Sequence, residues 1–177
     1  LQMMFCRKKK LLIILLIVAT LLLSSCSNIR SLQLSNLIDE EGTKIQQMSQ
    51  EIIRCFIEKD KNALKGLFCE QIRNLPDFDK EIEKAFEYFK GDWYTTANID
   101  KTASGGETIE SGRRTSWDVY PYISFIEVIS DGDGNPETSV EYYYSINYFW
   151  HIVNDEDKSL EGLQYIEIKL LNIDSIK

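Results

Sequence analysis

The hydrophobic period of this chain changes near Gly91, and that change constrains the fold more than any other feature. Before Gly91 the apolar residues recur at helical spacing, and after it they alternate with polar residues. A period of about 3.6 residues indicates amphipathic helices, whereas a period of two indicates half-buried strands. Because the helices precede the strands and do not alternate with them, the sequence predicts an α+β domain.

Three apolar stripes predict three helices between Asp39 and Gly91. The stripes consist of Ile45, Met48, Ile52, Cys55 and Phe56 in the first helix, Leu64, Leu67 and Phe68 in the second, and Phe78, Ile82, Ala85, Phe86 and Phe89 in the third. Asp60 is the predicted N-cap of the second helix, because an aspartate at that position can accept a hydrogen bond from a free backbone N–H group.

Beyond Gly91 the pattern predicts four to five antiparallel strands. The strand candidates are Trp93–Asn98, two segments around a turn at Ser111-Gly112, and the longer runs Trp117–Ile129, Val140–Val153 and Leu163–Ile173. Ser104-Gly105-Gly106 is predicted to be a loop, because two adjacent glycines usually interrupt a strand.

The strand Val140–Val153 has two different faces. Its even-numbered residues, among them Tyr144, Ile146 and Tyr148, are all apolar or aromatic, so we expect them to pack against the third helix. Its odd-numbered residues are mixed, which suits a polar-lined pocket, a partner surface, a sugar-stacking face or plain solvent. If a pocket is present, Tyr143, Asn147 and His151 are the residues predicted to line it.

The N-terminal segment is typical of an exported protein. Arg7, Lys8, Lys9 and Lys10 precede an apolar run from Leu11 to Leu23. A permanent membrane span needs about 20 apolar residues, so this shorter run suits the hydrophobic region of a signal peptide. An uncleaved signal anchor is the alternative.

The end of that run, Leu23-Ser24-Ser25-Cys26, resembles the lipobox of bacterial lipoproteins. The resemblance implies cleavage after residue 25, a diacylglyceryl group on Cys26, and a location on the outer face of the bacterial cell membrane. Residues 1–25 would then be the signal peptide, residues 26–38 a lipidated tether, and residues 39–177 a single domain. Two acyl chains give a stable anchor, so the lipid is the expected membrane partner.

Charge excludes one class of partner. The chain has a formal net charge of −8, and the basic cluster at residues 7–10 lies in the predicted signal peptide, so the mature chain is more acidic still. An acidic domain is repelled by the phosphates of nucleic acids, so we expect no nucleic-acid binding.

The cysteines outside the leader are Cys55 and Cys69. An exported domain can form disulfides, and an antiparallel pair of helices would bring the two cysteines near each other. They are therefore either bonded to each other or two small buried residues.

No motif in the sequence predicts a cofactor, a metal or a catalytic residue. Asp131-Gly132-Asp133-Gly134-Asn135 begins like a calcium loop, but Pro136 and Tyr142 stand where the EF-hand pattern needs Gly and Glu. The segment is better explained as a polar turn between two strands. His151 is the only histidine, and a single histidine cannot build a metal site.

Three segments carry a resemblance to a known family. They are CFIEKDKNALKGLFCEQI (Cys55–Ile72), DKEIEKAFEYFKGD (Asp79–Asp92), and Ser104-Gly105-Gly106 before the paired tyrosine-rich strands. Together they resemble an uncharacterised bacterial lipoprotein family, domain-of-unknown-function family 5104. The order of elements is also similar to the NTF2-like cone, in which a bent antiparallel sheet wraps a long helix.

The resemblance does not specify an activity, because this fold supports both enzymes and binding modules. The leading hypothesis is a non-enzymatic binding or assembly module at the cell envelope with an unidentified protein or small-molecule partner. The alternatives are a small-molecule enzyme that uses the cone pocket and a structural homo-oligomer.

Overall fold

The computed structural model describes residues 39–130 and 139–172. The chain divides into two compact units, Leu1–Glu41 and Gly42–Lys177, and the architecture below is that of the second unit. Within the described residues, no helix has both the length and the apolar character needed to cross a membrane.

The first helix spans residues 39–58, and its apolar stripe is largely buried, as predicted. Ile52, Cys55 and Phe56 are at most 1% exposed, while Met48 is only partly buried. The helix ends at Lys59, whose φ of 54° places it in the left-handed region common at helix ends. Asp60 then caps α2 (Lys61–Leu67) by accepting the Ala63 N–H at 2.9 Å, which confirms the predicted N-cap.

The third predicted helix is α4 (Phe78–Tyr88), and a single extra turn, α3 (Glu70–Arg73), precedes it. Phe78 and Ile82 of α4 are buried, and Phe89 at its C-cap is fully buried. The Lys59 ammonium donates hydrogen bonds to the carbonyl groups of Phe86, at 2.9 Å, and of Phe89. Lys59 therefore joins the end of the first helix to the end of α4.

Six antiparallel strands form one curved, open sheet, one or two more than predicted. They are β1 (Trp93–Ile99), β2 (Ser104–Glu110), β3 (Arg113–Tyr120), β4 (Tyr122–Ser130), β5 (Val140–Asn154) and β6 (Gly162–Leu170). The extra strands arise because two long rows of the sheet are each interrupted once.

Pro121 interrupts the first of these rows. β4 pairs with the first half of β5, and β3 pairs with its second half, so β3 and β4 lie end to end along one edge of β5. The predicted single strand Trp117–Ile129 is therefore wrong as one element. Its interruption has a physical cause, because proline has no N–H group to donate to a ladder.

β1 and β2 form the second interrupted row, since β1 pairs with β4 and β2 pairs with β3. The prediction that residues 104–106 form a loop is wrong, because they begin β2. A Cβ atom on Gly105 would lie 2.1 Å from the Asp118 carbonyl oxygen, so this glycine permits a close approach of two strands. The sheet thus contains four rows, with β6 on the far side of β5.

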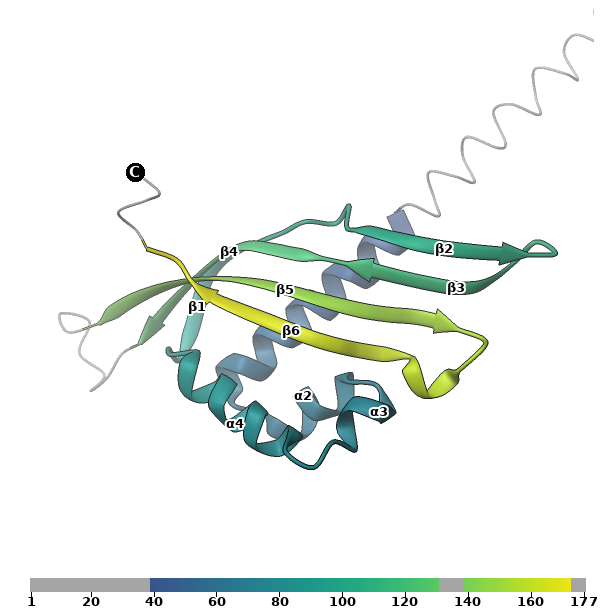
Figure 1. Ribbon diagram of the computed structural model, residues 1–177. Coiled ribbons are helices and arrows are strands. Elements are labelled where there is room, and N and C mark those ends of the chain that lie inside the picture. The colour runs from purple at the N-terminus through teal and green to yellow at the C-terminus, as the bar shows by residue number, and fades with distance from the viewer. Residues whose placement is uncertain (1–38, 131–138, 173–177) are drawn as a thin grey trace, which may run out of the picture. The chain divides into compact units, whose positions relative to one another are not determined.

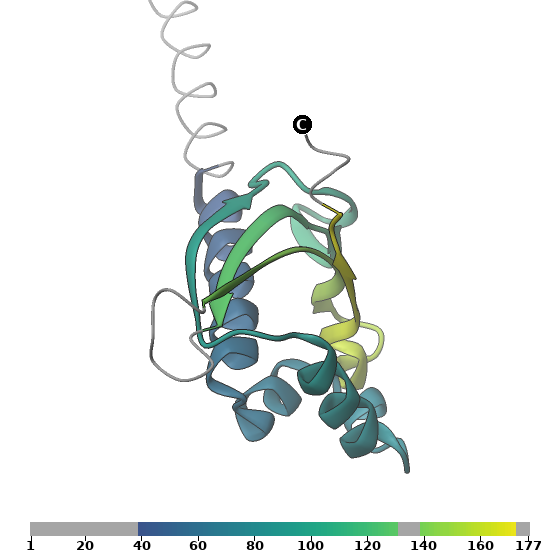
Figure 2. The same cartoon turned by 90° about the vertical axis from the view of Figure 1, so that its left-hand side faces the viewer.

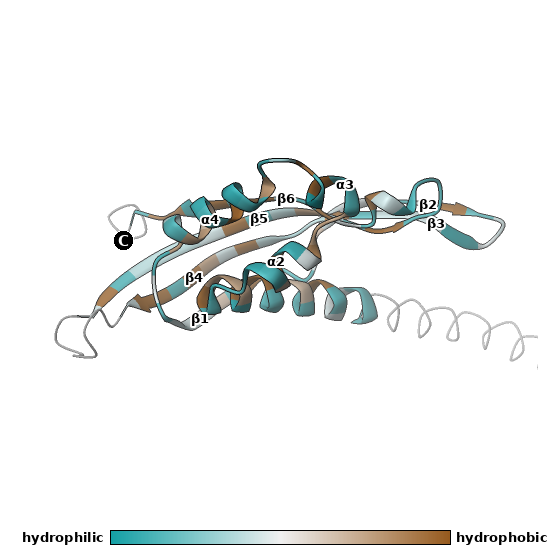
Figure 3. Cartoon of the chain, turned by 90° about the horizontal axis from the view of Figure 1, so that it is seen from below, coloured by the Kyte–Doolittle hydropathy of each residue, from teal (hydrophilic) through white to brown (hydrophobic). Residues whose placement is uncertain are grey.

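The helices cover one face of the sheet, which curves over the first helix (Figures 1 and 2). Tyr144, Ile146 and Tyr148 of β5 are at most 1% exposed, which confirms the predicted buried face, although Val140 at the start of the strand is exposed. Tyr144 stacks on Phe89 with ring centroids 4.4 Å apart, as expected for packing against α4. Seen from the helix side, hydrophobic and more polar stretches follow one another along β4 and β5 (Figure 3).

The first helix also contacts β5, which the sequence did not predict. The Tyr148 hydroxyl lies 2.8 Å from the Ser49 hydroxyl and donates to the Ile45 carbonyl at 3.2 Å. All three residues are buried, so these hydrogen bonds satisfy polar atoms inside the core.

Candidate binding groove between α4 and β6

A groove of about 580 Å³ lies between the helices and the last strand, and we call it the α4–β6 groove. Its lining residues come from the first helix, from α2 to α4 with their connections, and from β6. They are Phe56, Leu64, Phe68, Ile72, Leu75, Phe78, Glu81, Ile82, Lys84, Ala85, Tyr88, Gln164, Tyr165, Ile166 and Ile168. Its volume is within the range of about 300–1,000 Å³ typical of small-molecule sites.

The local sequence explains why this surface is apolar. Phe78, Ile82 and Ala85 share one face of α4 at helical spacing, and Ile166 and Ile168 share one face of β6 at strand spacing. The rest of the protein covers these two apolar faces only in part. Leu75, Tyr88 and Tyr165 at the edge of the groove are about half exposed, at 53%, 49% and 46%.

The charged and amide side chains that line the groove already have partners within the protein. Glu81 and Lys84 form an exposed ion pair at 2.7 Å. The Gln164 amide donates to the Leu160 carbonyl at 2.6 Å, and its oxygen accepts from the Cys69 thiol at 3.5 Å. The groove therefore favours a ligand with a mainly apolar surface.

Gly162 lets the start of β6, which forms one wall of the groove, pack closely against the segment before α3. It has a φ of 125°, and a Cβ atom there would lie 2.6 Å from the Cys69 nitrogen. The close approach lets the Cys69 N–H donate to the Leu163 carbonyl at 3.0 Å. This contact joins the start of β6 to the segment that leads into α3.

A comparison with known families assigns the chain to one of them. The family described as a domain of unknown function, DUF5104, matches residues 51–175. The chain belongs to this family. Among curated proteins, none matches this chain. The match runs from the first helix to the end of β6, so both walls of the groove lie within it.

The DUF5104 domain places Tyr143, Asn147 and His151 together on one face of β5, but none of them lines the α4–β6 groove. They belong to the odd-numbered face, which points away from the helices. Asn147 donates to Glu167 at 3.1 Å, and Tyr143 donates to Glu141 at 2.7 Å. The hydrogen bond to Glu141 raises the pKa of Tyr143 to about 12.

That outer face of the DUF5104 domain carries a row of aromatic rings. Tyr120 and Phe149 stack with centroids 4.4 Å apart, and Phe149 also contacts His151 at 4.6 Å and Tyr165 at 6.1 Å. The Nδ1 atom of His151 is buried without a hydrogen-bond partner in the described chain. The mixed character predicted for this face is confirmed, and the rings are largely packed against one another.

Both cysteines of the DUF5104 domain are buried free thiols in the structure, and they have different neighbours. Cys69 contacts Gln164, whereas Cys55 lies beside Arg54 and Glu51. Burial raises the pKa of Cys55 to about 11, so this thiol is protonated near neutral pH and is a weak nucleophile.

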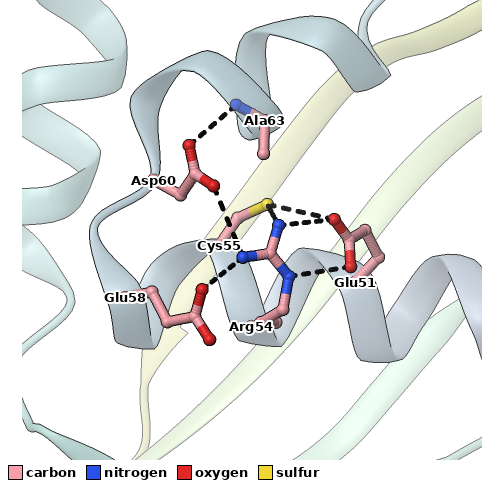
Figure 4. A network of polar contacts seen from close by, with 6 residues as sticks. All are labelled: Glu51, Arg54, Cys55, Glu58, Asp60 and Ala63. Atoms are coloured by element: carbon pink, nitrogen blue, oxygen red, sulfur yellow. Dashed lines mark hydrogen bonds and ion pairs between the residues drawn. The ribbon is translucent and has the colours of Figure 1, made fainter.

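Arg54 is the centre of a polar network on the first helix (Figure 4). Its guanidinium donates twice to Glu51, at 2.6 and 2.9 Å, and also contacts Glu58 and Asp60. These hydrogen bonds raise the pKa of Arg54, and the hydrogen bond from the Ala63 N–H is the main cause that lowers the pKa of Asp60. Because Asp60 also caps α2, the network connects the two helices and has a structural explanation.

No group of three or more metal-ligating side chains occurs among residues 39–130 and 139–172. The turn candidate at Asp131–Thr138 lies outside the described residues, as do Cys26 and the tether at residues 26–38.

The groove residues were not predicted as a site. The sequence assigns Phe78, Ile82 and Ala85 to a core stripe, which is correct but incomplete. One signal in the sequence could have indicated the groove. Leu75 and Tyr88 add apolar surface at the two ends of the third helix, and the sheet leaves this surface uncovered.

Proposed function

We propose that this protein is a lipid-anchored, non-enzymatic binding module on the outer face of the cell membrane, and that its α4–β6 groove takes an apolar ligand. The observation that carries the binding role is the groove itself, whose apolar wall is accessible and whose charged and amide lining groups are already paired. The anchor rests on the lipobox-like residues that end at Cys26.

We further propose that the domain is NTF2-like. A curved antiparallel sheet that wraps a long helix supports this assignment, and a cavity between the helices and the sheet is where such a fold holds its ligands. A fold of this kind accepts many ligands, so the groove must be tested directly.

Burial of apolar surface would drive binding. A ligand that removes about 200 Å² of apolar surface from water gains roughly 5 kcal/mol at about 25 cal/mol per Å², before the entropic cost of association is subtracted. A free energy of about 5 kcal/mol corresponds to a dissociation constant of roughly 0.2 mM, so submillimolar to millimolar affinity is the expected range for a simple apolar probe.

The test is a fluorescence titration with N-phenyl-1-naphthylamine, using the mature chain from residue 26 with Cys26→Ser to prevent lipidation. Ala85→Trp fills the groove from α4 and is expected to weaken binding at least tenfold. Lys80→Trp introduces the same side chain on the same helix, outside the lining, and is expected to leave binding unchanged.

A second groove variant, Ile168→Thr, removes apolar surface from β6 while keeping a β-branched residue, and it is also expected to weaken binding. Thermal melts of all three variants identify any loss of binding that comes from unfolding. Equal binding by wild type, Ala85→Trp and Ile168→Thr would rule out the groove as the site.

A further inference from the structure

β6 is an edge strand, and most of its outer edge is open. It pairs with β5 on one side. On the other side its ends are occupied, because the Leu163 carbonyl accepts the Cys69 N–H at 3.0 Å and the Leu170 N–H donates to the Tyr88 hydroxyl at 3.1 Å. Between these two points lies an open stretch, residues 164–169, which includes the β6 residues that line the groove. Figure 1 shows β6 at the edge of the sheet.

The ladder shows which backbone groups point outward. The Leu171 N–H donates to the Tyr143 carbonyl at 2.7 Å and so points toward β5, whereas the Leu170 N–H points away from it. Successive residues of a strand alternate in this direction. The N–H and C=O groups of Ile166 and Ile168 therefore point outward, and in the described chain they have no protein partner.

The same two residues also supply apolar side chains to the groove. An unpaired strand edge is a template for another strand, and here it borders an apolar groove. A small apolar molecule would fill the groove but would leave these backbone groups without partners. An extended peptide would occupy both the strand edge and the groove, because its backbone pairs with β6 while alternate side chains enter the groove.

Charge does not select between an acidic and a basic peptide. α4 carries four acidic and two basic residues in its sequence FDKEIEKAFEY. Its lysines lie within ion pairs, Lys80 with Asp77 and Lys84 with Glu81, and Lys169 on β6 pairs with Glu167. The α4 carboxylates Asp79 and Glu83 are likewise paired, with Lys65 and Lys61, so the charges that border the groove are largely balanced.

Resting on the proposed binding role of the groove, we propose that its occupant is an extended segment of another protein, with apolar residues at alternate positions, that adds to β6 as a further strand. The open stretch of β6 spans about 20 Å at roughly 3.4 Å per residue, enough for a segment of about six residues. The side chains of every second residue of that segment enter the groove.

The test uses a capped nine-residue peptide of alternating Lys and Val, with the mature Cys26→Ser chain. Two N-methylated versions provide the control, one methylated on the inner Val residues and one on the inner Lys residues. In a strand, residues whose side chains share a face also direct their N–H groups to the same edge. Strand addition therefore predicts that one version binds at least tenfold more weakly, while the other binds like the parent peptide.

Amide hydrogen exchange gives an independent measurement. The N–H groups of Ile166 and Ile168 are expected to exchange quickly in the free protein and at least tenfold more slowly with the peptide bound. Saturation with N-phenyl-1-naphthylamine is expected to leave the exchange of these amides unchanged. Ala85→Trp is expected to abolish peptide binding, whereas Lys80→Trp is expected to preserve it.

The outcomes separate this inference from the proposed function. If the fluorescent probe binds but the peptide does not, the groove remains a binding site and the peptide inference is overturned. Equal weakening by both N-methylated versions, or no protection of Ile166 and Ile168, would also overturn strand addition. A dimer in sedimentation experiments, with both amides protected before peptide is added, would assign the edge to a second copy of the chain and overturn it as well.

Discussion

The contrast between Ile146 and Asn147 shows how the core of this domain is specified one residue at a time. Ile146 is fully buried between the helices and the sheet, and its neighbour Asn147 is on the opposite face, where it donates to Glu167. A shift of one residue along β5 would exchange these environments.

We therefore expect Ile146→Asp to unfold the domain and Asn147→Asp to be tolerated. An unpaired buried carboxylate costs a large share of the roughly 5–15 kcal/mol that stabilises a typical domain. At the exposed position the new charge near Glu167 should cost less than about 1 kcal/mol. Urea denaturation followed by circular dichroism measures both, and a folded Ile146→Asp variant would contradict the assigned face.

Tyr148 makes stability sensitive to alkaline pH. Burial raises the pKa of its hydroxyl well above the usual value of about 10, and burial likewise raises the pKa of Tyr144. The folded state therefore keeps these protons at a pH where the unfolded chain releases them. Their contribution to stability is complete below about pH 10 and is lost as the pH rises toward their folded-state pKa.

The expected result is a urea midpoint that falls above about pH 10, with a shallower fall in Tyr148→Phe. Lys59 opposes this trend, because burial lowers its pKa, so the difference between wild type and Tyr148→Phe is the informative quantity. At neutral pH the variant should be about 1–3 kcal/mol less stable, since Ser49 and the Ile45 carbonyl lose their buried partner. Parallel pH curves for the two proteins would contradict the role assigned to Tyr148.

At the scale of secondary-structure elements, the sequence predicts those whose apolar period is regular and misses those that depend on contacts with distant residues. The first helix, α4 and β5 have regular periods and lie close to their predicted positions. The start of β2 was not predicted as a strand. Gly105 allows a close approach to Asp118 there, and the local sequence cannot reveal a contact with so distant a residue.

The pairing of β2 with β3 can be tested with two adjacent glycines. Gly105→Ala would place its Cβ atom 2.1 Å from a backbone oxygen of Asp118, and we expect a loss of about 1–3 kcal/mol because the strands must separate. Gly106→Ala is the matched control, since its first contact is the flexible Asp118 carboxylate at 3.3 Å. Thermal melts should show a lowered midpoint for Gly105→Ala alone; equal melts would contradict the close approach.

At the scale of the whole molecule, the groove could not be predicted because its walls are far apart in the sequence. α4 ends at Tyr88, and the opposing wall begins at Gln164. Each element shows an apolar face in its own sequence, yet only their arrangement leaves part of each face uncovered. The pocket expected at Tyr143, Asn147 and His151 followed from polarity alone, which identified the outer face of β5.

The membrane anchor is a prediction for the complete chain. Cys26→Ala removes the thiol that would carry the lipid, so we expect the variant to take up no lipid label and to keep an uncleaved leader. Labelling of cells with radioactive palmitate and immunoblotting of the chain length measure the two changes, and Ser27→Ala is a suitable control. Normal maturation and full lipid labelling of Cys26→Ala would contradict the lipoprotein assignment.

The hydrogen bonds between the first helix and Tyr148 also determine the order of events during folding. They join residues 99 and 103 positions apart, so Ser49 and Ile45 cannot reach their partner in the core until β5 has been synthesised. Such long-range contacts are typical of chains that fold in milliseconds to seconds. Until β5 is in place, the part of the first helix that packs on Tyr148 has no cover, and exposed apolar surface of this kind promotes aggregation of incompletely folded chains.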